Sequence, residues 1–177
     1  MQARRLAQAD GLRISVNDDV VPYDRDAVAR HWLARTLGAY PFLTSRFLAE
    51  EKDRFRNPVG HALREALPVL LEELLGEMNL ARLTPVLDQV VKIRAVQDFT
   101  ASQAVGFIFV LKDVLRHEEP GGLTPALEQR IDQMALTAFD LYVRCREKMD
   151  EIKAGEARRG TYVLDRIGYP RSDGEAR

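Results

Sequence analysis

Two apolar helical patterns joined by a short polar corner constrain the fold of this chain more than any other feature. They occupy the stretch from Pro85 to His117, in which apolar residues recur every three or four positions. This period predicts two helices, each with one face turned towards a core. Thr100 and Gln103 have the spacing of a capping box at the start of the second helix. The segment 98–100 is therefore predicted to be a tight corner between two packed helices.

The rest of the chain shows the same helical period between clear breaks. Asn57-Pro58 and Thr124-Pro125 each place a capping residue before a proline, as at a helix start. Thr84-Pro85 repeats this pattern before the first central helix. No two neighbouring segments show the alternation and turn residues of a β-hairpin. We therefore expect helices at about 24–37, 43–55, 58–75 with a kink or break at Pro68, 85–97, 100–117 and 125–153.

These patterns predict an all-α, single-domain helical bundle of about six or seven helices. Residues 23–155 are expected to form the bundle, residues 1–22 an N-terminal arm, and residues 156–177 a charged C-terminal tail. Four aromatic side chains are assigned to the core of the bundle: Trp32, Phe42, Phe47 and Phe55.

The charge balance argues against a nucleic-acid partner. The 177 residues include 26 basic and 27 acidic side chains, giving a formal net charge of −1. A nucleic-acid-binding domain needs a basic excess gathered on one face. No apolar run approaches the roughly 20 residues that span a bilayer, and no signal peptide precedes the first helix. Because the single cysteine, Cys145, also suits a reducing compartment, we expect a cytoplasmic protein that is not inserted in a membrane.

The three histidines do not form a recognisable metal or haem site. His31, His61 and His117 fall in different predicted helices, and none lies on the apolar stripe of its helix. A haem ligand has to face an apolar pocket, and a zinc site needs paired ligand spacing. The acidic residues lie on hydrophilic helix faces, without a nucleophile and base beside them. We therefore expect no metal, no cofactor and no enzymatic activity.

Charged residues on the buried stripes of the central stretch are the candidates for specificity. Arg94 continues the stripe of the first helix, and Lys112 continues the stripe of the second. A lone buried charge costs several kcal/mol, so each residue needs a partner. Arg94 has Asp98 one turn on and the free backbone groups at the corner as possible partners. For Lys112, a pair with Asp88 is feasible if the two helices fold back antiparallel. Removing Arg94 from such a pair would cost about 3–5 kcal/mol, much more than removing Arg130, which is expected to be exposed.

Several sequence strings carry a family resemblance. Residues 57–60 have the sequence NPVG, and residues 92–99 have the sequence KIRAVQDF, with the pattern continuing at 102–104 and 107–112. Over about residues 26–155, the chain resembles the N-terminal domain of RsbRD-type RsbT co-antagonists. The resemblance implies a helical sensory input domain that acts in signal transduction and stress-response regulation.

The resemblance also implies an assembly and a set of candidate residues. Related input domains have a globin-like fold without haem and pair as homodimers, so a homodimer and a regulatory protein partner are expected. The co-antagonists carry a downstream phosphorylatable domain, for which this sequence, ending at Arg177, has no room; this predicts a stand-alone domain. Ala101 stands where the family pattern has proline, although the capping residues beside it remain. The candidates for binding a ligand or partner are Arg94, Gln97, Asp98, Ser102, Gln103 and Lys112.

Three classes of function remain open at this point. The first is a stand-alone sensory or regulatory domain that acts through protein–protein interaction, with a small-molecule signal as a further option. The second is a haem- or tetrapyrrole-binding globin-like sensor, against which the positions of the histidines argue. The third is an enzyme whose site is not recognisable from sequence. For the polar residues of the corner, ion pairs that fix its geometry and a binding site are both open.

Overall fold

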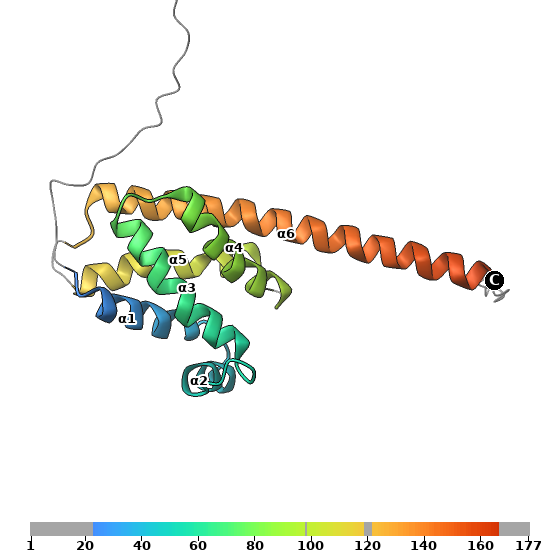
Figure 1. The fold of residues 1–177 in the computed structure, drawn as a ribbon, viewed down its shortest axis with the longest axis horizontal. Helices are drawn as coiled ribbons and strands as arrows, with labels where there is room; N and C mark the ends of the chain where they lie inside the picture. Colours follow the sequence, from blue (N-terminus) through green and yellow to red (C-terminus); the bar gives the residue numbers. More distant parts are fainter. Residues whose placement is uncertain (1–22, 98, 119–121, 167–177) are drawn as a thin grey trace, which may run out of the picture.

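Helices make up the regular structure of the chain (Figure 1). The computed structural model describes residues 23–166, apart from residue 98 and residues 119–121. Within these ranges there is no strand. In chain order the helices are α1 (Arg25–Leu37), α2 (Phe42–Glu50), α3 (Pro58–Leu75), α4 (Leu80–Val96), α5 (Ala101–Glu118) and α6 (Pro125–Arg166). The predicted all-α, single-domain bundle is confirmed.

The helices form a bundle from which α6 projects. α4 and α5 both pack along the first half of α6, α3 packs against α4, and α1 lies against α3 and α5. α2 is a short helix at one corner, in contact with α1 and α3. α6 has 42 residues, and its second half extends beyond the other helices as a single rod (Figure 1).

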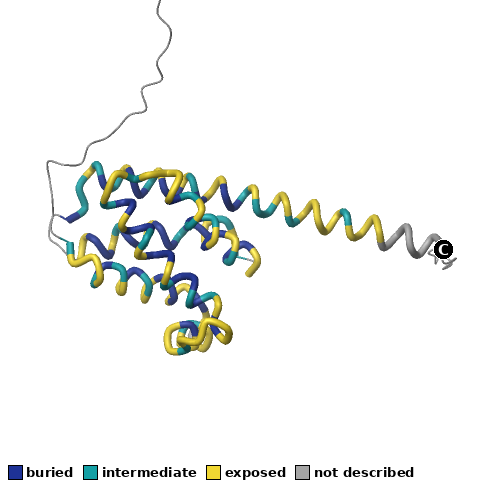
Figure 2. Tube along the Cα trace, viewed as in Figure 1, coloured by how far each residue is buried: buried dark blue, intermediate teal, exposed yellow. Residues whose placement is uncertain are grey.

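Burial follows the predicted apolar stripes inside the bundle, whereas the projecting part of α6 is mostly exposed (Figure 2). Trp32 is fully buried, as predicted, and its indole Nε1 donates a hydrogen bond to the carbonyl oxygen of Phe107 at 2.7 Å. This bond joins α1 to α5 and satisfies a donor that would be costly to bury alone. Among the described side chains, the last buried one on α6 is Tyr142. The core therefore ends partway along α6.

Capping side chains fix the starts of α1 and α6, and the cap of α6 is one that the sequence predicts. Asp24 Oδ1 accepts a hydrogen bond from the backbone N–H of Ala27 at 3.0 Å, at the start of α1. Thr124 Oγ1 accepts from the backbone N–H of Leu127 at 3.2 Å, at the start of α6. Each bond satisfies a backbone donor that a helix start would otherwise leave unpaired.

Asn57 starts α3 and also ties it to α2. Its Oδ1 accepts from the N–H of Gly60 at 2.8 Å, and its Nδ2 donates to the carbonyl oxygens of Leu48 and Glu51 at 2.9 and 2.8 Å. A Cβ at Gly60 would lie 2.3 Å from Asn57 Nδ2 and 2.6 Å from the Leu48 carbonyl oxygen. The NPVG string is thus a helix start built around a buried asparagine, and it requires glycine for close packing.

The predicted extent of the second helix was wrong. α2 ends before the expected end at Phe55, because carboxylates take the following backbone donors. Glu51 Oε1 accepts from the N–H of Asp53 at 3.0 Å, and Asp53 Oδ1 accepts from the N–H of Phe55 at 2.8 Å. Such local bonds compete with helix continuation. Phe47 and Phe55 are 46% and 83% exposed, so their assignment to the core was also wrong. The side chain of Phe42 lies outside the described residues.

The two helices before the corner also differ from the prediction. α3 continues through Pro68, so the predicted break does not occur, while the alternative of a kink stays a prediction. α4 begins at Leu80 with Asn79 as its cap, so the predicted start at Thr84-Pro85 was wrong. The earlier start places Leu83 inside the helix, where its side chain is fully buried on the same stripe as Leu87.

α6 is longer than predicted. It continues past the expected end at Lys153 to Arg166, so it enters the segment expected to be a charged tail. The added stretch, residues 154–166, contains Gly155 and Gly160 but no proline. A glycine within a helix costs only about 1 kcal/mol, which a long helix tolerates.

In the described part of the chain, no helix combines the length and the apolar character needed to cross a membrane. The expected arm at 1–22 lies outside the described residues.

Candidate functional site

Backbone and side-chain caps close the corner between α4 and α5. At the end of α4, the N–H of Gln97 donates to the carbonyl oxygen of Arg94 at 3.2 Å. At the start of α5, the N–H of Gln103 donates to Thr100 Oγ1 at 3.3 Å, and the N–H of Thr100 donates to Gln103 Oε1 at 3.0 Å. The predicted capping box is confirmed. It fixes the start of α5.

Arg94 places a buried cation behind this corner. The residue is 0% exposed, and its Nη1 donates to the carbonyl oxygen of Gln103 at 3.0 Å. The guanidinium carbon lies 5.5, 5.0 and 5.1 Å from the ring centres of Tyr40, Phe99 and Phe107. The negative faces of such rings attract a cation. Desolvation by burial lowers the pKa of Arg94, and the nearby Tyr40 partly opposes this shift.

The other edge of the guanidinium is not used within the described residues. Nε and Nη2 of Arg94 are shielded from solvent and donate to no acceptor there. A buried charged group with unmet hydrogen bonds costs several kcal/mol. The predicted partner, Asp98, lies outside the described residues. The expected burial of Arg94 is therefore confirmed, and the Arg94–Asp98 ion pair stays a prediction.

A cavity of about 250 Å³ lies beside Arg94. We call it the Arg94 cavity. The described residues that line it are Arg35, Thr36, Ala39, Arg94, Phe99, Gln103, Gly106, Phe107 and Val110. Thr36, from α1, is 1% exposed, and its hydroxyl has no hydrogen-bond partner among the described residues. A Cβ placed on Gly106 would meet no atom within 4 Å. The cavity thus combines open space with two buried side chains, Thr36 and Arg94, that keep donors without an acceptor among the described residues.

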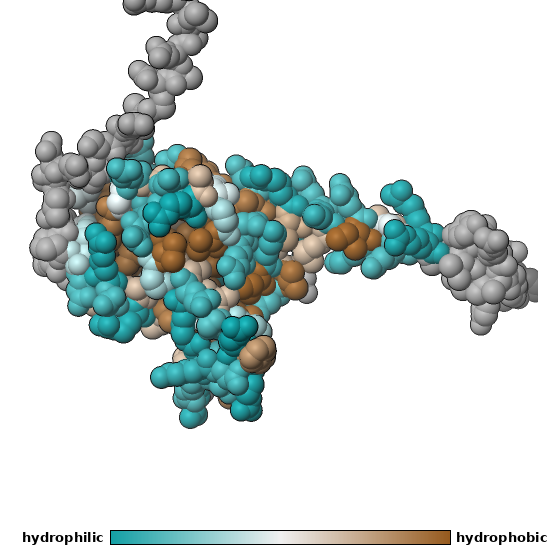
Figure 3. Space-filling view, viewed as in Figure 1, coloured by the Kyte–Doolittle hydropathy of each residue, from teal (hydrophilic) through white to brown (hydrophobic). Residues whose placement is uncertain are grey.

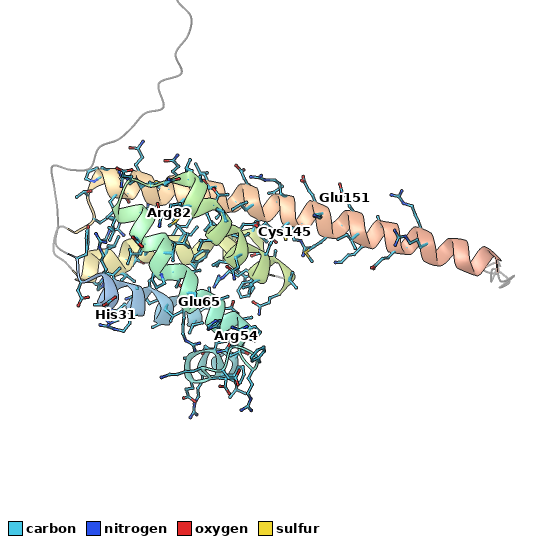
Figure 4. The ribbon with its side chains drawn as sticks, in the orientation of Figure 1. His31, Arg54, Glu65, Arg82, Cys145 and Glu151 are labelled. Atoms are coloured by element: carbon cyan, nitrogen blue, oxygen red, sulfur yellow. The ribbon has the colours of Figure 1, made fainter. Side chains whose placement is uncertain are left out.

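The same corner holds α6 at the point where it leaves the bundle. The hydroxyl of Tyr142 donates to the carbonyl oxygen of Phe99 at 2.7 Å, and Arg146 Nη1 lies 3.5 Å from the carbonyl oxygen of Ala95. Figure 4 labels Cys145 at this point of α6. Phe99 therefore contacts Arg94 with its ring and α6 with its carbonyl group. A displacement of Phe99 would therefore change its contact with Arg94 and its hydrogen bond with α6.

The structure separates the other predicted site residues. Gln103 lines the cavity beside Arg94. Gln97 is exposed, and its Oε1 accepts from the hydroxyl of Tyr40 at 3.1 Å. Ser102 is exposed too, with its Oγ 3.1 Å from Thr100 Oγ1. Neither Gln97 nor Ser102 lines the cavity. Gln97 contacts Tyr40 of the loop after α1, whereas the contact of Ser102 lies within the corner between α4 and α5.

Lys112 belongs to a different cluster, between α5 and α6. Its Nζ lies 3.2 Å from Glu128 Oε1 and 2.6 Å from Asp132 Oδ1. The expected partner, Asp88, instead pairs with Lys92 on α4. The predicted Lys112–Asp88 pair was therefore wrong. The reason is that the side of α5 that carries Lys112 faces α6, which supplies the carboxylates of Glu128 and Asp132.

Sequence reasoning missed three residues of the site. Thr36 lies in α1, and Tyr40 lies in the loop after it. Phe107 was noted only as part of a sequence pattern. No spacing in the sequence connects these residues to Arg94, because helix packing alone brings α1 beside the corner. The one usable signal is Thr36 itself, a polar residue on the inward side of a helix.

The histidines lie away from this cavity. His31 is exposed on α1 (Figure 4), His61 Nε2 lies 3.2 Å from Glu65 Oε1, and His117 Nδ1 lies 2.7 Å from the carbonyl oxygen of Asp113. No three His, Cys, Asp or Glu side chains within the described ranges are grouped so that they could hold a metal ion.

The comparisons with known proteins give one match. A search of curated proteins and a search of solved structures each found none. The family described as the RsbT co-antagonist protein rsbRD N-terminal domain matches residues 26–157. The matched range includes the whole bundle and the Arg94 cavity. The chain therefore belongs to the RsbRD N-terminal domain family of RsbT co-antagonists, which are regulatory domains of stress signalling.

Proposed function

We propose that this domain acts in signal transduction by binding a protein partner through α6, under the control of a small-molecule signal, and that it catalyses no reaction. Membership of the family supports a regulatory role. The partner proposal is carried by one observation, the exposure of α6 beyond Tyr142 (Figure 2). The family and the unpaired thiol of Cys145 also support a cytoplasmic setting.

A helix without tertiary contacts is only marginally stable in water. Most helical stability in proteins comes from packing one face against other elements. Beyond Tyr142, α6 continues to Arg166, and none of its described side chains there is buried. A surface that covers this part of α6 would stabilise it. That surface is the expected partner.

The projecting helix also has a stripe suited to a second helix. Cys145, Met149 and Ile152 follow at helical spacing, and Ile152 is 54% exposed. Figure 3 shows a hydrophobic patch on the otherwise hydrophilic surface of this rod. Cys145 and Ile152 are one heptad apart, the repeat with which two helices pack side by side. A second copy of the chain offers the same stripe, so we propose a homodimer through α6 as the simplest assembly.

The polar groups at the Arg94 cavity support binding without catalysis. They are two guanidinium groups, a hydroxyl and an amide. None of these transfers a proton readily at neutral pH, as a general acid or base must. The appearance of a chemically altered ligand after incubation, detected by mass spectrometry, would contradict this part of the proposal.

Light scattering on the full chain tests the assembly. We expect a mass of twice the 20.1 kDa of one chain at micromolar concentration. Ile152→Gln should shift the protein towards the monomer, because it removes the most exposed apolar side chain of the stripe. Glu147→Gln, at an exposed position on the opposite face of the same helix, is the control and should leave the mass unchanged. A wild-type mass of one chain at every concentration would contradict the homodimer.

A further inference from the structure

We infer that the Arg94 cavity binds a small organic anion, a carboxylate that carries a compact apolar or aromatic body. This inference names the chemical class of the signal in the proposed function and rests on that function for its consequence, a change in the assembly of α6. Binding itself depends only on the cavity.

The unused edge of Arg94 has the geometry of a carboxylate site. Nη1 is occupied by the carbonyl of Gln103, while Nε and Nη2 have no acceptor among the described residues. Nε and Nη2 lie on one edge of the planar guanidinium, where their two N–H bonds run parallel. A carboxylate accepts two such bonds at once, one on each oxygen. A neutral ligand offers no equally strong match to this pair.

A second unpaired group and a second cation favour the same ligand. The hydroxyl of Thr36 is buried and has no partner within the described part of the chain. In a helix a threonine hydroxyl often bonds to a backbone carbonyl of the preceding turn, which is not the case here. Arg35 also lines the cavity and is exposed. None of the described residues that line the cavity is acidic. The cavity therefore attracts an anion on entry and offers donors within.

The walls define the rest of the ligand. Phe99, Phe107 and Val110 supply an apolar lining. The volume of about 250 Å³ is below the range of about 300–1,000 Å³ that drug-sized ligands occupy. The body of the ligand must therefore be small and apolar, such as a single aromatic ring or a short branched chain.

Gly106 keeps this space open. Glycine within a helix is unfavourable relative to alanine, so its use needs a reason. No close packing supplies one, because a Cβ there would meet no atom within 4 Å. A larger side chain at this position would instead project into the cavity. The glycine therefore preserves the room that a ligand needs.

Entry of a ligand would act on α6. Solvent does not reach Nε or Nη2 in this conformation, so a carboxylate must displace a neighbouring side chain to contact them. The ring of Phe99 lies against Arg94, and the carbonyl of Phe99 accepts the hydroxyl of Tyr142. Displacement of Phe99 would thus alter the contact that holds α6 at the edge of the bundle.

The experiment is a titration of the isotope-labelled full chain, followed by NMR. The probes are benzoate and 3-methylbutanoate, with uncharged benzamide as the matched control. We expect the carboxylates to shift the amide signals of Thr36, Phe99 and Gly106 at millimolar concentration, and benzamide to bind at least roughly tenfold more weakly. Arg94→Met should abolish the shifts. Arg144→Met, at an exposed arginine of α6, should leave them unchanged.

A second variant separates loss of binding from loss of folding. Gly106→Leu keeps Arg94 but fills the cavity, so it should unfold at the same temperature as the wild type or higher and bind neither carboxylate. Equal binding of benzoate and benzamide, or binding that survives both substitutions, would overturn the inference. So would the absence of any shift in the folded wild type. Carboxylate binding that leaves the light-scattering mass unchanged would uphold the cavity and remove only ligand control from the proposed function.

Discussion

Arg94 and Arg130 are two arginines buried in the same bundle, and they differ in what their guanidinium groups contact. Arg130, on α6, is 5% exposed, and its Nη1 lies 3.0 Å from the carbonyl oxygen of Leu74 and 2.5 Å from that of Gly76. These carbonyls belong to the C-terminal end of α3, where backbone acceptors lack partners and a positive charge is favourable. Arg94 has one carbonyl, three aromatic rings and an edge without acceptors among the described residues.

Burial does not distinguish the two arginines, whereas their acceptors do. Desolvation lowers the pKa of both Arg94 and Arg130. Arg130 closes a helix end, which is a structural role visible in its partners. Arg94 stands beside a cavity with donors unused. The comparison suggests a rule: we take a buried charge as a candidate binding group only when its neighbours leave part of it unsatisfied.

The largest expected effect on stability is that of Arg130→Met. It would leave the buried carbonyl of Leu74 without this donor, along with the carbonyl of Gly76, and we expect a loss of about 2–3 kcal/mol in the free energy of unfolding. Urea denaturation measures it, with the exposed Arg144→Met as the control at a few tenths of a kcal/mol. The expectation that Arg130 is exposed was wrong. Equal losses for the two variants would remove the structural role assigned to Arg130.

Tyr142→Phe should cost about 1 kcal/mol, the typical value of one hydrogen bond. It removes the bond to Phe99 and thereby loosens the corner from α6. Tyr23→Phe is the matched variant, because the hydroxyl of Tyr23 donates to the carbonyl of Gly122 before α6 begins. Hydrogen exchange should report faster exchange near residues 140–150 in Tyr142→Phe only. The same exchange pattern in both variants would show that the corner does not hold α6.

Lys112→Met should cost about 0.5–1 kcal/mol, because Lys112 is 15% exposed and its carboxylate partners are about half exposed. Desolvation lowers the pKa of Lys112, but the hydrogen bonds to Asp132 and Glu128 outweigh it and raise the pKa above its ordinary 10.5. The contribution is therefore fully present below pH 10.5 and is lost as pH rises through the folded-state pKa.

Stability curves of wild type and Lys112→Met between neutral and strongly alkaline pH measure this contribution. The two free energies of unfolding should differ by a constant amount up to the ordinary pKa of lysine and converge above it. If the free energies of unfolding of wild type and Lys112→Met are equal at neutral pH, the pair of Lys112 with Glu128 and Asp132 does not form.

Sequence reasoning succeeded where the controlling interactions are local. The capping box at Thr100 and Gln103 spans one helical turn, and the burial of Arg94 follows from the helical period. It failed where packing between distant segments decides. The partners of Lys112 lie on α6, and the position of Thr36 beside the cavity depends on how α1 packs against α5. The end of α6 was missed because charged residues and glycines weaken a helix without ending it.

The smallest expected effect on stability is that of Arg94→Met. This variant distinguishes most clearly between a structural role, as for Arg130, and the binding role proposed for Arg94. An apolar side chain of similar length keeps the contacts with Tyr40, Phe99 and Phe107 and removes a desolvated charge. The carbonyl of Gln103 would lose one donor, but as a carbonyl within α5 it also accepts the hydrogen bond of the helix itself. Replacing a buried, poorly paired charge by an apolar group is often neutral or stabilising. We expect a change within about 0.5 kcal/mol of zero.

The contrary result has an equally definite meaning. The sequence-based hypothesis of an Arg94–Asp98 ion pair predicts a loss of about 3–5 kcal/mol, because the substitution would strand a buried carboxylate. Urea denaturation of Arg94→Met, alone and combined with Asp98→Asn, separates the two cases. A large loss that Asp98→Asn reverses would make Arg94 a structural residue like Arg130. A negligible change would mean that folding does not require the buried charge. A loss of benzoate binding in the same variant would then be due to the guanidinium and not to a damaged fold.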